Sequence, residues 1–122
     1  MIIVEGIDHI TLGSVDLKAS VKFYSDLFDF EVLDDSKKGQ AIITLDPIKL
    51  KLIKVDKIEN SLTDAKLPLL SFEMDVDDFT EAISEIEEMD IAIVKGPESA
   101  NDGEFLHFKD PSGNIIEIFY RG

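Results

Sequence analysis

The stretch DPSGNIIEIFY, Asp110 to Tyr120, places a turn sequence directly before an apolar run. Pro, Ser, Gly and Asn are typical of turns, and an apolar run bounded by them predicts a strand. Within that run, Glu117 is the only charged residue between Ile115 and Phe119. A carboxylate in a buried strand destabilises the fold unless it meets water, a cation or a hydrogen-bond donor. Glu117 therefore indicates an open or functional face on this strand.

This strand is the last of a series of elements that occurs twice along the chain. Each half contains a predicted strand, a helix with apolar residues at helical spacing, and three further extended runs. The repeated order predicts two βαβββ modules. In the first half the segments are residues 7–12, GSVDLKASVKFYSDLFDF, FEVLDD, AIITL and IKLKLIKV. In the second half they are residues 69–76, DDFTEAISEIEEM, and residues 90–94, 104–109 and 114–120, with a hairpin turn at Asn101-Asp102-Gly103.

The length of the chain limits how these modules are organised. With 122 residues it is long enough for one domain and too short for two independent ones. We therefore expect a single domain with an α+β fold, made of two tandem modules at about residues 1–58 and 67–122. The polar segment at about residues 59–66 is the expected hinge between them.

The first predicted helix carries a signal at each end. Ser14 or Asp16 is its expected N-terminal cap. Asp29 stands at its other end, and Asp tolerates the left-handed conformation there at modest cost. Phe23 and Tyr24, at helical spacing from the other apolar residues, are expected to pack on the sheet.

Charge and composition exclude several classes of partner. The chain has 12 Lys and Arg against 26 Asp and Glu, which gives a formal net charge of -14. Such a chain repels phosphate backbones and anionic lipid headgroups, so we expect neither nucleic acid nor membranes as partners. It has no cysteine, no basic apolar leader and no long apolar run, which together predict a cytoplasmic protein. A small molecule is the expected partner.

Side chains alternate between the two faces of a strand, and this alternation places polar residues of both halves on the sheet face opposite the one that a helix would cover. In the first predicted strand His9 and Thr11 share a face, and in the last one Glu117 shares its face with Ile115 and Phe119. If the helices cover one side of each sheet, these residues face the other side. The predicted ligand-binding residues on that side are Thr11, Phe105, His107, Ile115 and Phe119, beside His9 and Glu117.

Two segments resemble a known family. IDHITLGSVDLKASVKFYSDLFDFEVL carries a His in the first strand and the pattern V-D-L-x-x-S-V-x-F-Y-x-D-L, and GEFLHFKDPSGNIIEIF carries D-P-x-G-N-x-x-E. Together they resemble the vicinal oxygen chelate superfamily, which includes glyoxalase I, the bleomycin-resistance proteins, the fosfomycin-resistance thiol transferases and the extradiol dioxygenases. The resemblance covers nearly the whole chain. It implies that the paired modules form a cup-shaped mixed sheet with helices on its outer face.

The resemblance also implies a site for a divalent metal ion. In metal-using relatives the first-strand His and the last-strand Glu are ligands, and the matching positions are His9 and Glu117, with Glu117 also the expected catalytic residue. The next ligand position falls on Leu69, or on Ser71 in an alternative register, so the set is incomplete. His107 would complete a set of two His and one carboxylate suited to Mn, Fe, Ni or Zn. The alternative without metal is a direct pair between His9 and Glu117.

Two classes of function follow from the resemblance. With an incomplete metal site, the cup binds or sequesters a small molecule without a cofactor, as bleomycin-resistance relatives do. With a complete site, the protein is a metal-dependent lyase, isomerase or dioxygenase of the glyoxalase type. Relatives of this length often pair their chains, sometimes exchanging halves, so we expect a homodimer, with domain swapping between the two chains as an open alternative.

Overall fold

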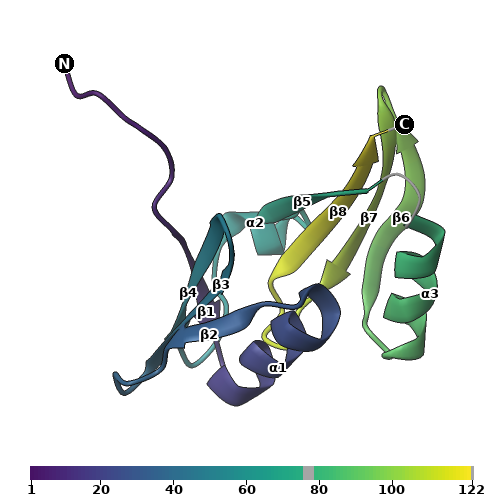
Figure 1. Cartoon of the computed structure of the whole chain (residues 1–122). Coiled ribbons are helices and arrows are strands. Elements are labelled where there is room, and N and C mark those ends of the chain that lie inside the picture. The colour runs from purple at the N-terminus through teal and green to yellow at the C-terminus, as the bar shows by residue number, and fades with distance from the viewer. Residues whose placement is uncertain (76–78, 122) are drawn as a thin grey trace. The chain divides into compact units, whose positions relative to one another are not determined.

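The computed structural model describes residues 1–75 and 79–121, and the chain divides into two compact units, Met1–Lys57 and Ile58–Gly122 (Figure 1). The predicted strand at residues 69–76 and the predicted helix that follows it both extend into residues 76–78. That part of each prediction lies outside the described residues. In the described ranges, no helix is long and apolar enough to cross a membrane.

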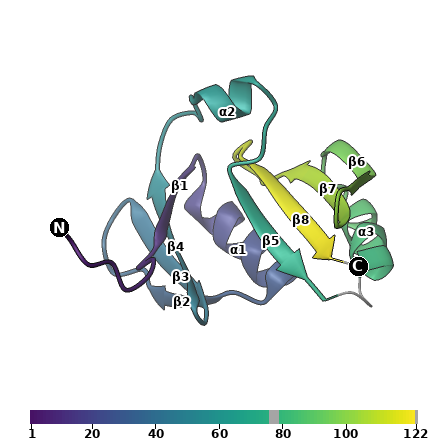
Figure 2. The same cartoon turned by 90° about the horizontal axis from the view of Figure 1, so that it is seen from above.

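The first unit is a four-stranded mixed sheet with one helix beside it. Its elements are β1 (Ile10–Ser14), α1 (Leu17–Phe28), β2 (Glu31–Asp34), β3 (Gln40–Leu45) and β4 (Ile48–Lys54). The strand order is β1-β4-β3-β2, in which β1 runs parallel to β4 and the other pairs are antiparallel. α1 lies against β3 and β4 on one face of this sheet, as Figure 2 shows.

Both ends of α1 are fixed by aspartates. Asp16 is the N-cap, and its Oδ1 accepts a hydrogen bond from the backbone N–H of Ala19 at 3.1 Å. Ser14, the other candidate cap, is instead buried, and its hydroxyl oxygen lies 2.6 Å from that of Ser20. Asp29 ends the helix in the left-handed conformation with φ 66°, which confirms the prediction for this position.

The core of the first unit lies between α1 and its sheet. Tyr24 is fully buried, and its ring centroid lies 5.1 Å from that of Phe23 and 6.0 Å from that of Phe30, both edge to face. Alternate strand residues are buried as well, whereas Thr11, next to the buried Leu12, is exposed. The buried strand residues are Leu12, Ala41, Ile43, Leu50 and Leu52.

The second unit repeats this arrangement after a short additional helix. Its elements are α2 (Ser61–Asp64), β5 (Leu70–Met74), α3 (Phe79–Glu88), β6 (Ile93–Ala100), β7 (Gly103–Lys109) and β8 (Ile115–Arg121). The strand order is β5-β8-β7-β6, again with one parallel pair, β5 and β8. The α+β fold of two βαβββ modules is therefore confirmed. The expected hinge at residues 59–66 contains α2, and its role as a hinge stays a prediction.

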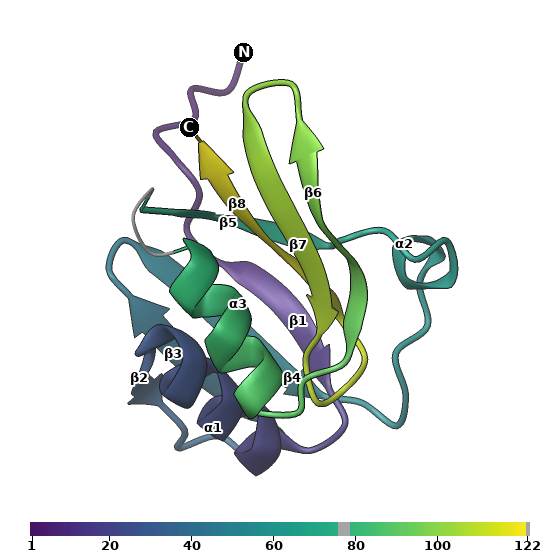
Figure 3. The same cartoon turned by 90° about the vertical axis from the view of Figure 1, so that its right-hand side faces the viewer.

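α3 runs along one face of the second sheet, as Figure 3 shows. Phe79 at its start is buried, and its ring centroid lies 5.5 Å from that of Tyr120 in β8. Ile86 is buried two turns later on the same helix. The buried residues of β7 and β8 include Leu106, Phe108, Ile116 and Ile118, and they alternate with the residues of the other face.

Two predicted strand boundaries are wrong. The first strand begins at Ile10 rather than at Ile7, because its ladder with β4 starts at the pair of Ile10 and Leu50, so His9 precedes the strand. The sixth strand spans residues 93–100 rather than 90–94. Gly96 and Pro97 interrupt its alternating pattern, and the register with β7 shifts around them. The hairpin at residues 101–103 is confirmed.

The turn between β7 and β8 is held by a buried aspartate. Oδ1 of Asp110 accepts hydrogen bonds from the backbone N–H groups of Ser112 at 2.9 Å and Asn114 at 3.0 Å. Its Oδ2 accepts from the side-chain amide of Asn114 at 2.9 Å. Gly113 adopts φ +100°, which favours glycine there. The turn quoted at the outset therefore fixes where β8 begins.

Replacing Asp110 by alanine tests this role. Asp110→Ala leaves the N–H groups of Ser112 and Asn114 without their acceptor, so we expect the free energy of unfolding to fall by about 2–3 kcal/mol. Urea denaturation followed by circular dichroism measures this change. The control is Asp46→Ala at the other Asp-Pro sequence, where the exposed side chain predicts a change within about 0.5 kcal/mol. Equal losses in the two variants would contradict the assignment.

Candidate functional site

Three polar side chains from neighbouring strands of the second unit form a row that we call the carboxylate row: Ser71, Glu117 and His107. β8 lies between β5 and β7, and the register places Glu117 opposite Ser71 of β5 and His107 of β7. The Ser71 hydroxyl donates to Oε1 of Glu117 at 2.6 Å. Nε2 of His107 lies 2.6 Å from Oε2. Both carboxylate oxygens are therefore engaged within this unit.

The contact between His107 and Glu117 decides which ring nitrogen carries a hydrogen. An ionised carboxylate only accepts hydrogen bonds, so Nε2 of His107 is the donor. Nδ1 of the same ring is buried and has no hydrogen-bond partner in the part of the chain that the structure describes. It is an acceptor on a neutral ring and a donor on a protonated one. In the described residues this buried nitrogen is therefore an unsatisfied hydrogen-bonding position.

The carboxylate row remains reachable from solvent. The Glu117 side chain is 20% exposed, the His107 side chain is 9% exposed, and Ser71 is exposed. A carboxylate oxygen has two lone pairs, so each oxygen of Glu117 can accept a second hydrogen bond. The row thus presents a fixed acceptor at a partly open surface. Ile115, another predicted site residue, lies two residues before Glu117 and is buried.

Two phenylalanines form the next row of the same strand face. Phe105 and Phe119 are directly opposite in the register of β7 and β8, two residues along from the carboxylate row. The Phe105 ring lies 4.8 Å from the His107 ring between centroids. The Lys95 ammonium lies 5.8 Å from the Phe105 centroid, and the Arg121 guanidinium carbon lies 5.1 Å from the Phe119 centroid. The face therefore combines aromatic walls with charged groups.

Of the predicted site residues, His9 and Thr11 lie in the first unit. Nδ1 of His9 lies 2.7 Å from Oδ2 of Asp8, and the His9 side chain is 38% exposed. The hydrogen bond from His9 and, second, the positive charge of Lys49 hold the pKa of Asp8 below its ordinary value. Thr11 lies opposite Lys51 in the parallel pair of β1 and β4. His9 thus has a carboxylate partner within its own unit.

The donors of the second unit do not fit a metal ion as they are arranged. Two donors that bind one tetrahedral ion at about 2.0–2.2 Å lie roughly 3.4 Å apart. Nε2 of His107 and Oε2 of Glu117 are 2.6 Å apart, which is a hydrogen-bond distance. Within either unit, the described residues include no group of three or more His, Asp or Glu that could hold an ion. The predicted set of His9, His107 and Glu117 draws on both units and stays a prediction.

The structure answers part of the question that Glu117 raised. The sequence predicts either a metal ion or a direct contact with His9 as its partner, whereas the second unit supplies Ser71 and His107. The sequence offered Ser71 only as an alternative position for a metal ligand, because no local pattern pairs it with a residue 46 positions later. The contacts of Lys95 with Phe105 and of Arg121 with Phe119 were not predicted either.

Comparison with known proteins identifies relatives over nearly the whole chain. A family model described as the glyoxalase/bleomycin resistance protein/dioxygenase superfamily matches residues 6–118. The chain is 27% identical over 116 residues to the metallothiol transferase FosB of Staphylococcus epidermidis, an alignment that covers 94% of this chain and 81% of that protein. It is 25% identical over 116 residues to FosB of Staphylococcus haemolyticus, covering 94% and 83%.

Solved structures of similar fold include proteins from Listeria monocytogenes and Nostoc punctiforme. The fosfomycin resistance protein FosX from Listeria monocytogenes, complexed with Mn(II) and a sulfate ion, aligns with a TM-score of 0.82 at 17% identity, over 98% of this chain and 93% of that one. A glyoxalase/dioxygenase from Nostoc punctiforme aligns with a TM-score of 0.78 at 24% identity, over 97% and 92%. At these identities the likeness establishes the fold.

Titration of Asp8 tests the contact made by His9. We expect His9→Ala to raise the pKa of Asp8 toward 3.8, and Lys49→Ala to raise it by less. A depressed carboxyl pKa favours the folded state above the ordinary pKa, and this contribution is lost as pH falls through the lowered value. NMR titration of the carboxyl carbons measures the shift. The pKa of Asp34, lowered by hydrogen bonds from Ser36, is the internal control and stays unchanged.

Proposed function

Because its family match spans residues 6–118, the chain belongs to the glyoxalase/bleomycin resistance protein/dioxygenase superfamily, and we propose that it binds a small molecule on the strand face that carries Glu117. The observation that supports this proposal is the carboxylate row. Ser71 and His107 hold both oxygens of Glu117, so the carboxylate is fixed in place without a metal ion. A fixed acceptor selects ligands that bring a hydrogen-bond donor to it.

The charge of the ligand follows from the surroundings of this acceptor. The chain carries a net charge of -14, which favours the approach of cations over anions. The two cationic groups near the aromatic row already have partners, because Lys95 lies 3.6 Å from Glu98 and Arg121 pairs with Asp102. We therefore propose a cationic or neutral ligand, with a donor on Glu117 and an apolar part on Phe105 and Phe119.

In this proposal the protein sequesters its ligand and does not transform it. Bleomycin-resistance proteins belong to the same superfamily by its description, and bleomycin is a cationic glycopeptide that matches the ligand class above. The site needs only shape, apolar contact and a few fixed polar groups for such a role.

A second candidate function is supported by the comparison with curated proteins. Both relatives described above are metallothiol transferases, aligned over 81% and 83% of their own length, and the FosX structure contains Mn(II). By this analogy the chain is a divalent-metal-dependent enzyme that acts on fosfomycin or a similar substrate. This function would require His9, His107 and Glu117 to bind one metal ion together. The hydrogen bond between Nε2 of His107 and Oε2 of Glu117 would then have to be replaced by separate bonds from each residue to the ion.

Binding measurements on variants of Glu117 test the first proposal. We expect metal-free bleomycin to bind the wild-type protein and raise its melting temperature, as any ligand of the folded state does. Glu117→Gln removes the negative charge and is expected to weaken binding about tenfold or more, measured by isothermal titration calorimetry. The matched control is Glu104→Gln in β7, an exposed position on the opposite strand face, where affinity should stay unchanged. Equal affinities of Glu117→Gln and wild type would contradict the proposal.

Elemental analysis separates the two candidate functions. Protein purified without chelators is compared with the double variant His9→Ala, Glu117→Ala. Stoichiometric Mn, Fe, Ni or Zn in the wild type and its loss in the variant would favour the enzyme. Negligible metal in both, together with bleomycin binding, would favour the sequestering protein.

A further inference from the structure

The helix of the first unit leaves part of its own sheet uncovered. α1 packs on β3 and β4, whereas β2 is the edge strand of the same sheet. Val32 of β2 is paired with Ile43, which is 1% exposed, so both side chains are on the face that carries α1. Val32 is nevertheless 49% exposed. An apolar side chain on the helix-covered face is therefore left without cover at this edge.

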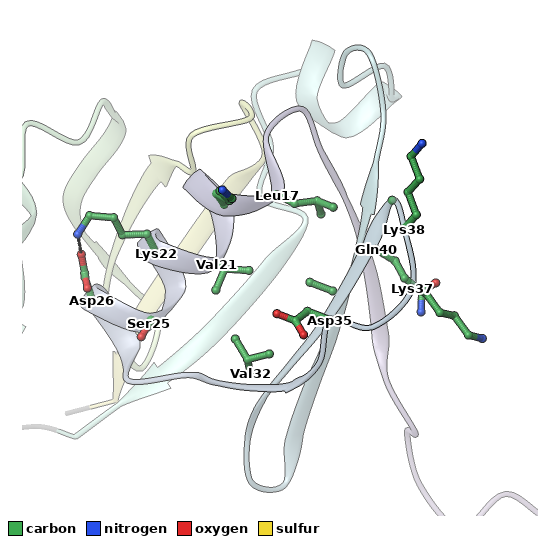
Figure 4. Close-up of a pocket in the computed structure, with 13 residues that line it drawn as sticks. Leu17, Val21, Lys22, Ser25, Asp26, Val32, Asp35, Lys37, Lys38 and Gln40 are labelled. Carbon is green, nitrogen blue, oxygen red and sulfur yellow. Dashed lines mark hydrogen bonds and ion pairs between the residues drawn. The ribbon is translucent and has the colours of Figure 1, made fainter.

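The uncovered edge is part of a groove between α1 and the β2–β3 hairpin, with a volume of about 570 Å³. In Figure 4 the side chains of Val21 and Val32 extend into the space between the helix and the strands, and Leu17 lies on the wall nearby. Two small residues of the lining leave this space open, because Gly39 has no side chain and the buried Ala41 has only a methyl group. The volume is in the range of roughly 300–1,000 Å³ that small-molecule sites occupy.

The lining of this groove carries positive charge on an otherwise acidic protein. Four lysines and two aspartates line it, which gives a local charge of +2 where the whole chain has -14. Lys22 pairs with Asp26 on α1, so these two charges cancel. The other charged residues of the lining, all exposed, are Lys18, Lys37, Lys38 and Asp35. The groove therefore favours an anion locally, against the charge of the whole chain.

Polar groups gather at the hairpin end of the groove. Figure 4 shows Lys37, Lys38 and Gln40 together at this end, with the two lysine side chains directed outward. Within residues 1–75 and 79–121, Lys38 takes part in no ion pair. A lysine ammonium on its flexible four-carbon stem can turn toward a bound anion, and the side-chain amide of Gln40 supplies a further donor.

We propose that this groove binds a small amphipathic anion, an aliphatic carboxylate, with its chain against Val21 and Val32 and its carboxylate at Lys37 and Lys38. Binding removes apolar surface of the ligand and of the two valines from water. The lysines supply charge-assisted hydrogen bonds, and their charge outweighs the repulsion from Asp35. The site uses no residue of the carboxylate row, so it stands independently of the proposed function.

A series of ligands with the same alkyl chain tests this proposal on the wild-type protein. Sodium octanoate should shift the backbone amide resonances of Val21, Val32 and Gly39 saturably in a nitrogen–proton NMR titration. Its dissociation constant should be at least about threefold lower than those of octanol and octylammonium. The net charge of the chain alone predicts the reverse order for octylammonium. Octanol or octylammonium binding here as tightly as octanoate, or no saturable shift with octanoate, would overturn the proposal.

Charge variants test the contact at the hairpin end. The double variant Lys37→Gln, Lys38→Gln should weaken octanoate binding about tenfold, whereas Asp35→Asn should strengthen it because a repulsive charge is removed. The matched control is Lys66→Gln, Lys109→Gln, which changes the net charge equally at two exposed positions outside the groove. Equal losses of affinity in the two double variants would show that only the overall charge matters and would overturn the lysine contact.

Filling the groove tests where the alkyl chain lies. Val32→Trp places a large side chain in the groove, so octanoate affinity should fall about tenfold or more while the circular dichroism spectrum stays that of the wild type. Leu33→Trp is the matched control, because Leu33 is the next residue, is 57% exposed and does not line the groove. Wild-type affinity in a folded Val32→Trp protein would place the ligand elsewhere and overturn the proposal.

Discussion

The need to satisfy a carboxylate inside a sheet determines much of the second unit. Glu117 lies in an interior strand between Ile116 and Ile118, which are both fully buried, so its own side chain must find partners on the opposite face. Ser71 and His107 supply them from the two adjacent strands at 2.6 Å each. The contact with Ser71 joins the parallel strands β5 and β8, and the contact with His107 joins the antiparallel strands β7 and β8. A single acidic residue thereby connects three strands.

Register makes this arrangement possible, and the turn before β8 sets the register. Asp110 accepts hydrogen bonds from Ser112 and Asn114, so the strand begins at a fixed residue. A slip of one residue would turn Glu117 toward α3 and Ile116 toward the open face. The same slip would separate the Phe105 and Phe119 pair. The chemistry of the face therefore depends on a turn that contributes no side chain to it.

The sequence predicted the elements that depend on local pattern. The two modules, the left-handed Asp29, the hairpin at residues 101–103 and the strand around Glu117 all have signals within a few residues of themselves. The sixth strand was misplaced because Gly96 and Pro97 conceal its alternation. The contact of Ser71 with Glu117 was beyond such reasoning, since it joins strands far apart in sequence whose parallel register has no local signature. His107 was predicted to share a face with Glu117, as a metal ligand or a ligand-binding residue, and the register confirms the shared face. Its direct contact with the carboxylate was not predicted, and its role as a metal ligand stays a prediction.

In each unit the last strand along the chain occupies an interior position, because β4 lies between β1 and β3 and β8 lies between β5 and β7. During synthesis, β5 therefore has no strand partner in its own sheet until β8 has left the ribosome, whereas β6 and β7 can already form their hairpin. In the first unit β1 likewise has no strand partner until β4 has been synthesised. This sheet can be completed while the second unit is still being synthesised. The first sheet can therefore form before the second during translation. The chain is most exposed to aggregation or chaperone binding while its second half is being synthesised and β5 is unpaired.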